Sequence, residues 1–143
     1  MGRRGSDDGQ ITVLIIGFVM IVVLAVGVVA NASKAFVYRR SLASWADGAA
    51  IAAAQSVAEE VVYAGPEVDE LPIAAAEARR VVGEYVARNG LGRRFDDLRV
   101  EVGVDQAAST ITVEFAVRVP LLLSGDTAGI PVAASASATA PLD

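Results

Sequence analysis

The spacing of hydrophobic positions changes twice along this chain. Residues 11–30 hold twenty consecutive uncharged positions, which at about 1.5 Å per residue reach across the roughly 30 Å hydrocarbon core of a bilayer. Residues 31–64 contain no proline and are rich in alanine, so we expect the helix to continue beyond the apolar run. Apolar side chains recur there three and four positions apart, which indicates one buried face.

A second helix is predicted over about 72–89. Pro72 suits the first helical position, and Asn89-Gly90 supplies a stop. The helix should turn an apolar face toward a partner, formed by Ile73, Ala76, Val81, Val82, Tyr85 and Val86. After Phe95 the pattern becomes alternating, which is typical of half-buried strands. We expect strands at about 98–105, 110–119 and 131–139, joined as an antiparallel sheet.

These elements predict a membrane-anchored α+β protein with four parts. They are a flexible tail (1–10), a transmembrane helix (11–30), its extramembrane continuation (31–64), and a small α+β head (65–143) that contains the second helix and the three-stranded antiparallel sheet. The anchor should be single-pass in the cytoplasmic membrane. Positive charges are nearly equal on its two sides and do not orient it. We expect an extracytoplasmic carboxyl-terminal domain because that is the usual arrangement of an exported, anchored protein.

The composition of the chain excludes most kinds of catalytic site. The chain has no histidine and no cysteine, so triads with histidine, the usual zinc sites and disulfides cannot form. Its net charge of −5 argues against nucleic acid as a partner. The acidic pairs Glu59-Glu60, Asp69-Glu70 and Asp96-Asp97 are interpreted as solvated positions. We expect no enzyme activity, no catalytic residues, no metal, no cofactor and no small-molecule substrate.

Small residues in the long helix predict where it packs. Small side chains allow helices to approach closely in a membrane, and alanine stripes do the same outside it. The expected helix-packing interface consists of Gly17, Ala25, Gly27, Ala32, Trp45, Ala49 and Ala53. We expect the first four of these residues to face another subunit.

Several motifs also carry a resemblance to a known family: residues 8–14 (DGQITVL), 36–40 (FVYRR), 46–54 (ADGAAIAAA), 119–122 and 132–138. In this order they resemble the TadE/TadG-like pilus-assembly family of the tight-adherence (Flp) pilus system. The resemblance implies a minor pilin-like envelope protein. Its implied partners are the membrane, other pilus or pilin-like subunits and the inner-membrane assembly platform, and its location could extend to a pilus at the cell surface.

The same resemblance implies a processing site for a prepilin peptidase. A cut after Gly9 would make Gln10 the first residue of the mature helix and Leu14 the fifth. Processed members of the family have a glutamate at that fifth position. Two alternatives therefore stay open, a processed subunit and an unprocessed, permanently anchored accessory protein.

Two function classes follow from these predictions. The first is a non-catalytic, single-span pilin-like component that acts through helix packing and subunit contacts. The alternative is an extracytoplasmic binding domain that uses the exposed face of its sheet. That domain would be tethered, or released by signal-peptidase cleavage between Ala32 and Ser33, after the small-x-small motif Ala30-Asn31-Ala32.

Overall fold

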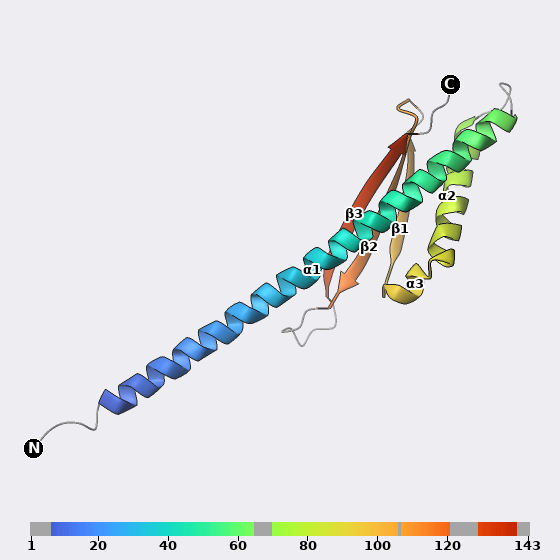
Figure 1. Ribbon diagram of the computed structural model, residues 1–143. Coiled ribbons are helices and arrows are strands. Elements are labelled where there is room, and N and C mark those ends of the chain that lie inside the picture. Colours follow the sequence, from blue (N-terminus) through green and yellow to red (C-terminus); the bar gives the residue numbers. More distant parts are fainter. Residues whose placement is uncertain (1–6, 65–69, 106, 121–128, 140–143) are drawn as a thin grey trace, which may run out of the picture.

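A computed structural model of the chain describes residues 7–64, 70–105, 107–120 and 129–139. One long helix extends far beyond a head in which helices lie against a sheet (Figure 1). The elements are α1 (Asp7–Ala64), α2 (Glu70–Arg88), α3 (Leu91–Arg94), β1 (Arg99–Asp105), β2 (Thr110–Val119) and β3 (Ile130–Thr139). The α+β fold class predicted from the sequence, with its long apolar helix, second helix and three antiparallel strands, is confirmed.

Helix α1 has 58 residues, which corresponds to a length of about 87 Å. It begins at Asp7, four residues before the predicted transmembrane helix. Residues 1–6 lie outside the described residues, and the flexible tail stays a prediction. A single glycine such as Gly9 costs a helix only about 1 kcal/mol relative to alanine. That cost is too small to end a helix that continues for fifty residues.

The second helix also starts earlier than its proline suggested. Helix α2 begins at Glu70, two residues before Pro72, which is possible because the first turn of a helix has amide groups without intrahelical partners. It ends as expected near Gly90, whose φ of 63° is left-handed. The short helix α3, which the pattern did not predict, follows directly. Ala76, expected on the apolar face of α2, is exposed, and Ala78 is buried there instead.

The sheet has the order β1-β2-β3, and both strand pairs are antiparallel. The central strand β2 alternates buried and more exposed positions along its length. Its inward side chains are Ile111, Val113, Phe115, Val117 and Val119, all almost completely buried. The opposite face of the sheet carries Thr112, Glu114 and Arg118 toward solvent. This arrangement is the amphipathic pattern of a sheet that is covered on one face.

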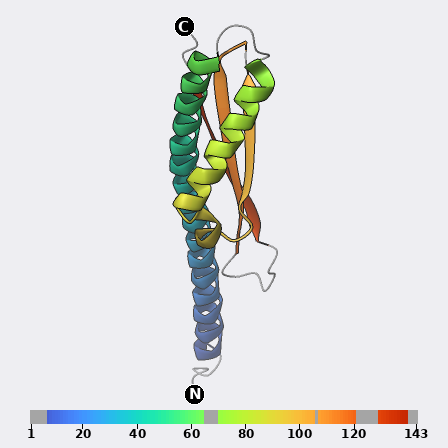
Figure 2. The same ribbon diagram turned by 90° about the vertical axis from the view of Figure 1, so that its right-hand side faces the viewer.

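Both long helices cover the same face of the sheet (Figure 2). The outer half of α1 packs on β2 and β3, and α2 packs beside it toward β1. Many core positions of α1 and β3 are alanines: Ala46, Ala50 and Ala53 of α1 are completely buried, and Ala134 and Ala136 of β3 pack against the same core. Small side chains on both surfaces allow the helix to lie close to the sheet.

Candidate assembly surface

The first half of α1 extends beyond the head, and none of the described residues covers its apolar side chains. Fifteen large apolar side chains between Ile11 and Val29 are exposed, most of them by more than half of their surface. Soluble monomers rarely expose contiguous apolar patches larger than a few hundred Å². By length and composition this helix could cross a membrane. This apolar half of the helix, residues 11–30, is the main candidate for contact with lipid or with other helices.

Small residues interrupt the apolar surface where close contacts were predicted. Gly17, Ala25 and Ala32 are exposed and Gly27 is partly exposed. A methyl group added at Gly17 would meet no atom within 4 Å, so this glycine is not required by contacts within the chain. It lies in an apolar hollow of the helix surface that Leu14, Phe18 and Ile21 also line. The geometry leaves room for a neighbouring helix at this position.

The predicted processing residues are part of the same helix. Gly9 and Gln10 are exposed and helical, and both line the hollow around Gly17. Leu14, at the fifth position after the predicted cut, also lines it. This placement does not show whether the peptidase cuts after Gly9, and processing stays a prediction.

The other predicted packing residues lie inside the head. Ala49 and Ala53 are completely buried, so they pack within the chain and cannot contact another subunit. Trp45 is partly buried and meets the ring of Tyr85 edge-on, with the ring centroids 6.2 Å apart. The guanidinium of Arg94 lies 5.9 Å from the centroid of the Trp45 ring. Trp45 therefore joins α1 to α2 and to α3.

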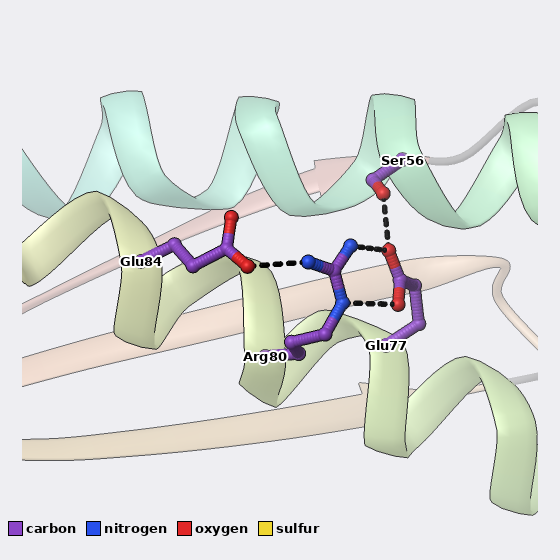
Figure 3. Close-up of polar contacts among 4 residues, drawn as sticks. All are labelled: Ser56, Glu77, Arg80 and Glu84. Atoms are coloured by element: carbon purple, nitrogen blue, oxygen red, sulfur yellow. Dashed lines mark hydrogen bonds and ion pairs between the residues drawn. The ribbon is translucent and has the colours of Figure 1, made fainter. Parts of the chain in front are cut away.

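A polar cluster links α1 to α2 near the far end of the head (Figure 3). The Ser56 hydroxyl of α1 donates to Glu77 Oε1 of α2 at 2.5 Å. Arg80 donates from Nε and Nη2 to the two Glu77 oxygens, at 2.8 and 2.6 Å, and from Nη1 to Glu84 at 2.5 Å. The three α2 residues sit three and four positions apart, which places them on one helix face. Their spacing is visible in the sequence, but the role of Ser56 is not.

This cluster changes the acidity of Glu77. The hydrogen bonds from Arg80 and then from Ser56 favour the carboxylate and lower the pKa of Glu77 from its ordinary 4.5 to about 2. The same carboxylate raises the pKa of Arg80. Arg80 and Glu84 are both more than half exposed, so the ion pair between these two residues contributes little to stability.

A pH dependence follows from the lowered pKa of Glu77. Above about pH 4.5 the carboxylate is ionised in both the folded and the unfolded chain, and its favourable contacts contribute fully. As the pH falls from about 4.5 toward about 2, the unfolded chain binds the proton first, so this part of the stability is lost. We expect Glu77→Gln to flatten this part of the melting temperature profile between pH 5 and 2.5. The melting temperature is measured by circular dichroism at each pH, and Glu84→Gln is the control. Equal pH profiles for Glu77→Gln and the unmodified protein would contradict this role of Glu77.

One further contact ties the head to the base of the apolar helix. Lys34 Nζ donates to the carbonyl oxygen of Pro120 at 3.1 Å. Lys34 is only four residues beyond the apolar run, so the end of β2 lies at the level where the run stops. The head therefore begins directly beside the segment expected in lipid.

Comparison with known protein families gives a match to part of the chain. Residues 9–65 match the model of the Flp pilus-assembly TadE/G-like family. This part of the chain is similar to the TadE/G-like family. The match covers 57 of the 143 residues and confirms the family resemblance predicted from the sequence. No curated protein and no solved structure matches the chain significantly. The match supports the interpretation of this protein as a component of pilus assembly.

The TadE/G-like segment, residues 9–65, contains both surfaces described above. It includes the exposed apolar half of α1 and the half that forms the core of the head. Residues 132–138, which also resembled the family, lie outside the matched residues, and residues 121 and 122 lie outside the described ones.

Within the Asp47-Gly48 pair of this segment, only Gly48 has a packing explanation. Asp47 is exposed. Gly48 faces the ring of Tyr85, and a methyl group added at Gly48 would overlap the Tyr85 hydroxyl and lie 3.1 Å from the Cζ atom. Glycine at this position allows Tyr85 to lie across α1 and to reach Trp45.

The acidic residues that the structure describes do not converge on a site. Glu59, Glu60, Asp96 and Asp97 are exposed, while Asp69 lies outside the described residues. In the described part of the chain no three acidic side chains come together in a way that could hold a metal ion.

Proposed function

We propose that this protein is a single-span, pilin-like component of a tight-adherence (Flp) type pilus assembly system, acting through helix packing and subunit contacts. The anchor is residues 11–30 in the cytoplasmic membrane, and the head, with the carboxyl-terminal domain, is extracytoplasmic. The observation that carries this proposal is an exposed apolar helix half within a TadE/G-like segment. Such a surface needs lipid or other apolar helices around it.

The proposed partners are other pilus or pilin-like subunits and the inner-membrane assembly platform. The contacts are made by the small residues of the apolar half, Gly17, Ala25, Gly27 and Ala32. Close approach at small residues increases van der Waals packing between helices in lipid, where no hydrophobic driving force exists.

Gly17→Leu tests this contact directly. Because a side chain at Gly17 meets no atom of this chain, we expect an unchanged fold and unchanged membrane insertion, together with a loss of most crosslinking to neighbours along residues 14–32. The measurement is site-specific photocrosslinking in membranes of the native host. Val19→Leu, at an exposed position that is not small and does not line the hollow around Gly17, is the matched control. Equal crosslinking of Gly17→Leu and the unmodified protein would contradict the contact.

The state of the amino terminus separates the open alternatives. Mass spectrometry of the protein from its own cells gives a start at Gln10 for a processed subunit and at Met1 for a standing anchor. A start at Ser33 would mean a released binding domain and would overturn the proposal. Helix α1 is continuous through residues 30–33, which supports the anchored forms.

A further inference from the structure

The charged side chains of the head are sorted between its two ends. The end that adjoins the apolar half of α1, here called the membrane end, consists of residues 31–40 of α1, the corner 88–99 that contains α3, and residues 116–120 at the end of β2. Figure 2 shows these segments at the end of the head from which the apolar half of α1 leaves. Among the described residues, the basic side chains of this end are Lys34, Arg39, Arg40, Arg88, Arg93, Arg94, Arg99 and Arg118. Its acidic side chains in the same described residues are Asp96 and Asp97.

Contacts between these segments hold the membrane end beside the anchor. Lys34 donates to the carbonyl oxygen of Pro120, and the rings of Tyr38 and Phe95 meet edge-on with their centroids 6.1 Å apart. At about 1.5 Å per residue, Lys34 lies about 6 Å and Arg40 about 15 Å beyond residue 30, where the apolar run stops. The headgroup layer of a bilayer is roughly 5 to 7 Å thick, and charges act over a Debye length of about 8 to 10 Å. With residues 11–30 in the bilayer, these basic side chains are within electrostatic reach of lipid phosphates.

The sorting of charge follows position in space and not the direction of the chain. Helix α1 leads away from the anchor, and its head portion has basic residues first and Glu59 near its end. Strand β1 also leads away, from Arg99 to Asp105. Strand β2 and helix α2 run back toward the anchor (Figure 1), and each has an arginine at or next to its last residue, Arg118 and Arg88. Elements of opposite direction therefore contribute the same sign of charge to the membrane end.

The acidic end of the head is too far from the membrane to offset this attraction. Glu59 follows Lys34 by 25 residues, which is about 38 Å along α1 and several Debye lengths. The net charge of −5 therefore does not describe the surface that meets the lipid. An anionic surface attracts the membrane end and repels the opposite end, so it also orients the head.

The acidic end of a second copy is another anionic surface that could meet this basic end. Copies that are anchored in one membrane hold their heads at the same height, so like ends lie side by side and repel each other. The lipid phosphates directly beneath the head are the anionic groups that its position offers.

We propose that the membrane end of the head binds the headgroups of anionic phospholipids in the membrane that holds the anchor. Basic side chains beside a membrane span attract anionic lipids, and this attraction falls off within a Debye length. Transmembrane helices tilt by about 20° on average, and a tilt toward α3 brings Arg88 and Arg93 closer to the lipid. The bound headgroups hold the head against the membrane surface in one orientation. The proposal rests on the anchor of the proposed function and adds the lipid class that the head recognises.

The test uses the full chain in lipid vesicles with one fluorophore on α3. The chain has no cysteine, and a Cβ atom added at Gly92 would meet no atom within 4 Å, so Gly92→Cys accepts a single label without a change of fold. The vesicles contain phosphatidylcholine alone or equal parts of phosphatidylcholine and phosphatidylglycerol, with a trace of lipid that carries a nitroxide quencher on its headgroup. We expect at least about twofold stronger quenching in the anionic vesicles, and no such difference in 1 M salt, where the Debye length is about 3 Å.

Two double variants test which arginines are responsible. Arg88→Gln combined with Arg93→Gln should remove most of the difference between the two kinds of vesicle. Arg79→Gln combined with Arg80→Gln is the matched control, because it removes the same charge from positions of α2 that precede Arg88 by eight residues or more, about 12 Å further from the membrane. The control should keep the difference, and circular dichroism checks that both variants fold.

Three results would overturn the proposal. They are equal quenching in the two kinds of vesicle, an equal effect of the two double variants, and a difference that appears only when each vesicle holds many chains, which would assign the membrane end to a second copy. Flotation of the vesicles on a density gradient separates this failure from failure of the proposed function. A chain that floats with neutral vesicles but shows equal quenching keeps its anchor, whereas a chain that floats with neither kind of vesicle overturns both proposals.

Discussion

Replacing Val19 and Ile21 together by arginine should greatly reduce the share of the protein that stays in the membrane. Each arginine near the centre of a span costs about 2.5 to 3.5 kcal/mol on insertion scales, and each lost valine or isoleucine forfeits about 0.3 to 0.6 kcal/mol. The double change therefore costs about 6 to 8 kcal/mol. The fourteen Leu, Ile, Val and Phe residues of positions 11–30 contribute about 4 to 8 kcal/mol in favour of insertion, so the balance falls to near zero.

The measurement is the fraction of protein that stays with membranes of the native host after alkaline carbonate extraction. Both side chains are more than half exposed and lie outside the head, so the head should fold in either case. Val19→Leu with Ile21→Leu is the matched control and should remain in the membrane. A double-arginine variant that resists extraction as well as the control would show that residues 11–30 are not held by lipid.

Phe115→Ala should cause the largest loss of head stability from a single substitution. Phe115 is the largest completely buried side chain of the described residues and occupies the middle of the central strand. Its register partners are Val100 on β1 and Ala134 on β3. Truncating a buried phenylalanine costs about 3 to 5 kcal/mol, because the lost contacts leave a cavity that the core fills only in part. The total free energy of unfolding of a domain of this size is about 5 to 15 kcal/mol.

Denaturant unfolding of the protein in detergent measures this loss. The single tryptophan, Trp45, sits between α1 and α2, so its fluorescence reports whether the two helices remain packed. Val100→Ala, at a 38% exposed position of β1, is the control and should cost no more than about 1 kcal/mol. Equal midpoints for the two variants would contradict the placement of Phe115 in the core.

The periodicity of the sequence was sufficient to predict the helices and strands, because each of these elements depends on local spacing. Alternation over residues 110–119 is the pattern of a strand with one covered face, and β2 has that burial along its length. The uncharged run 11–30 and the alanine-rich residues after it have no helix breaker, so one continuous helix forms. The boundaries of the elements were predicted less accurately, as the starts of α1 and α2 show. A glycine or a proline near the start of a helix destabilises the helix only a little.

The partners of the small residues could not be predicted from spacing. Gly17 and Ala49 look alike as small positions on one apolar stripe, yet Gly17 is open to another molecule and Ala49 is completely buried in its own head. Gly48 is read from the sequence only as a weak helix position, whereas the structure shows the Tyr85 ring against it. These differences arise from contacts between residues about forty positions apart or more.

The sequence by itself determined the apolar helix, its amphipathic continuation, the three strands, the TadE/G-like resemblance and the absence of histidine and cysteine chemistry, since all of these depend on residue type and local order. Only the tertiary structure decided which half of α1 is left without a cover, that Ser56 binds Glu77, and that the basic side chains of several elements gather at the membrane end of the head. Those features depend on which surfaces meet after the chain folds back on α1.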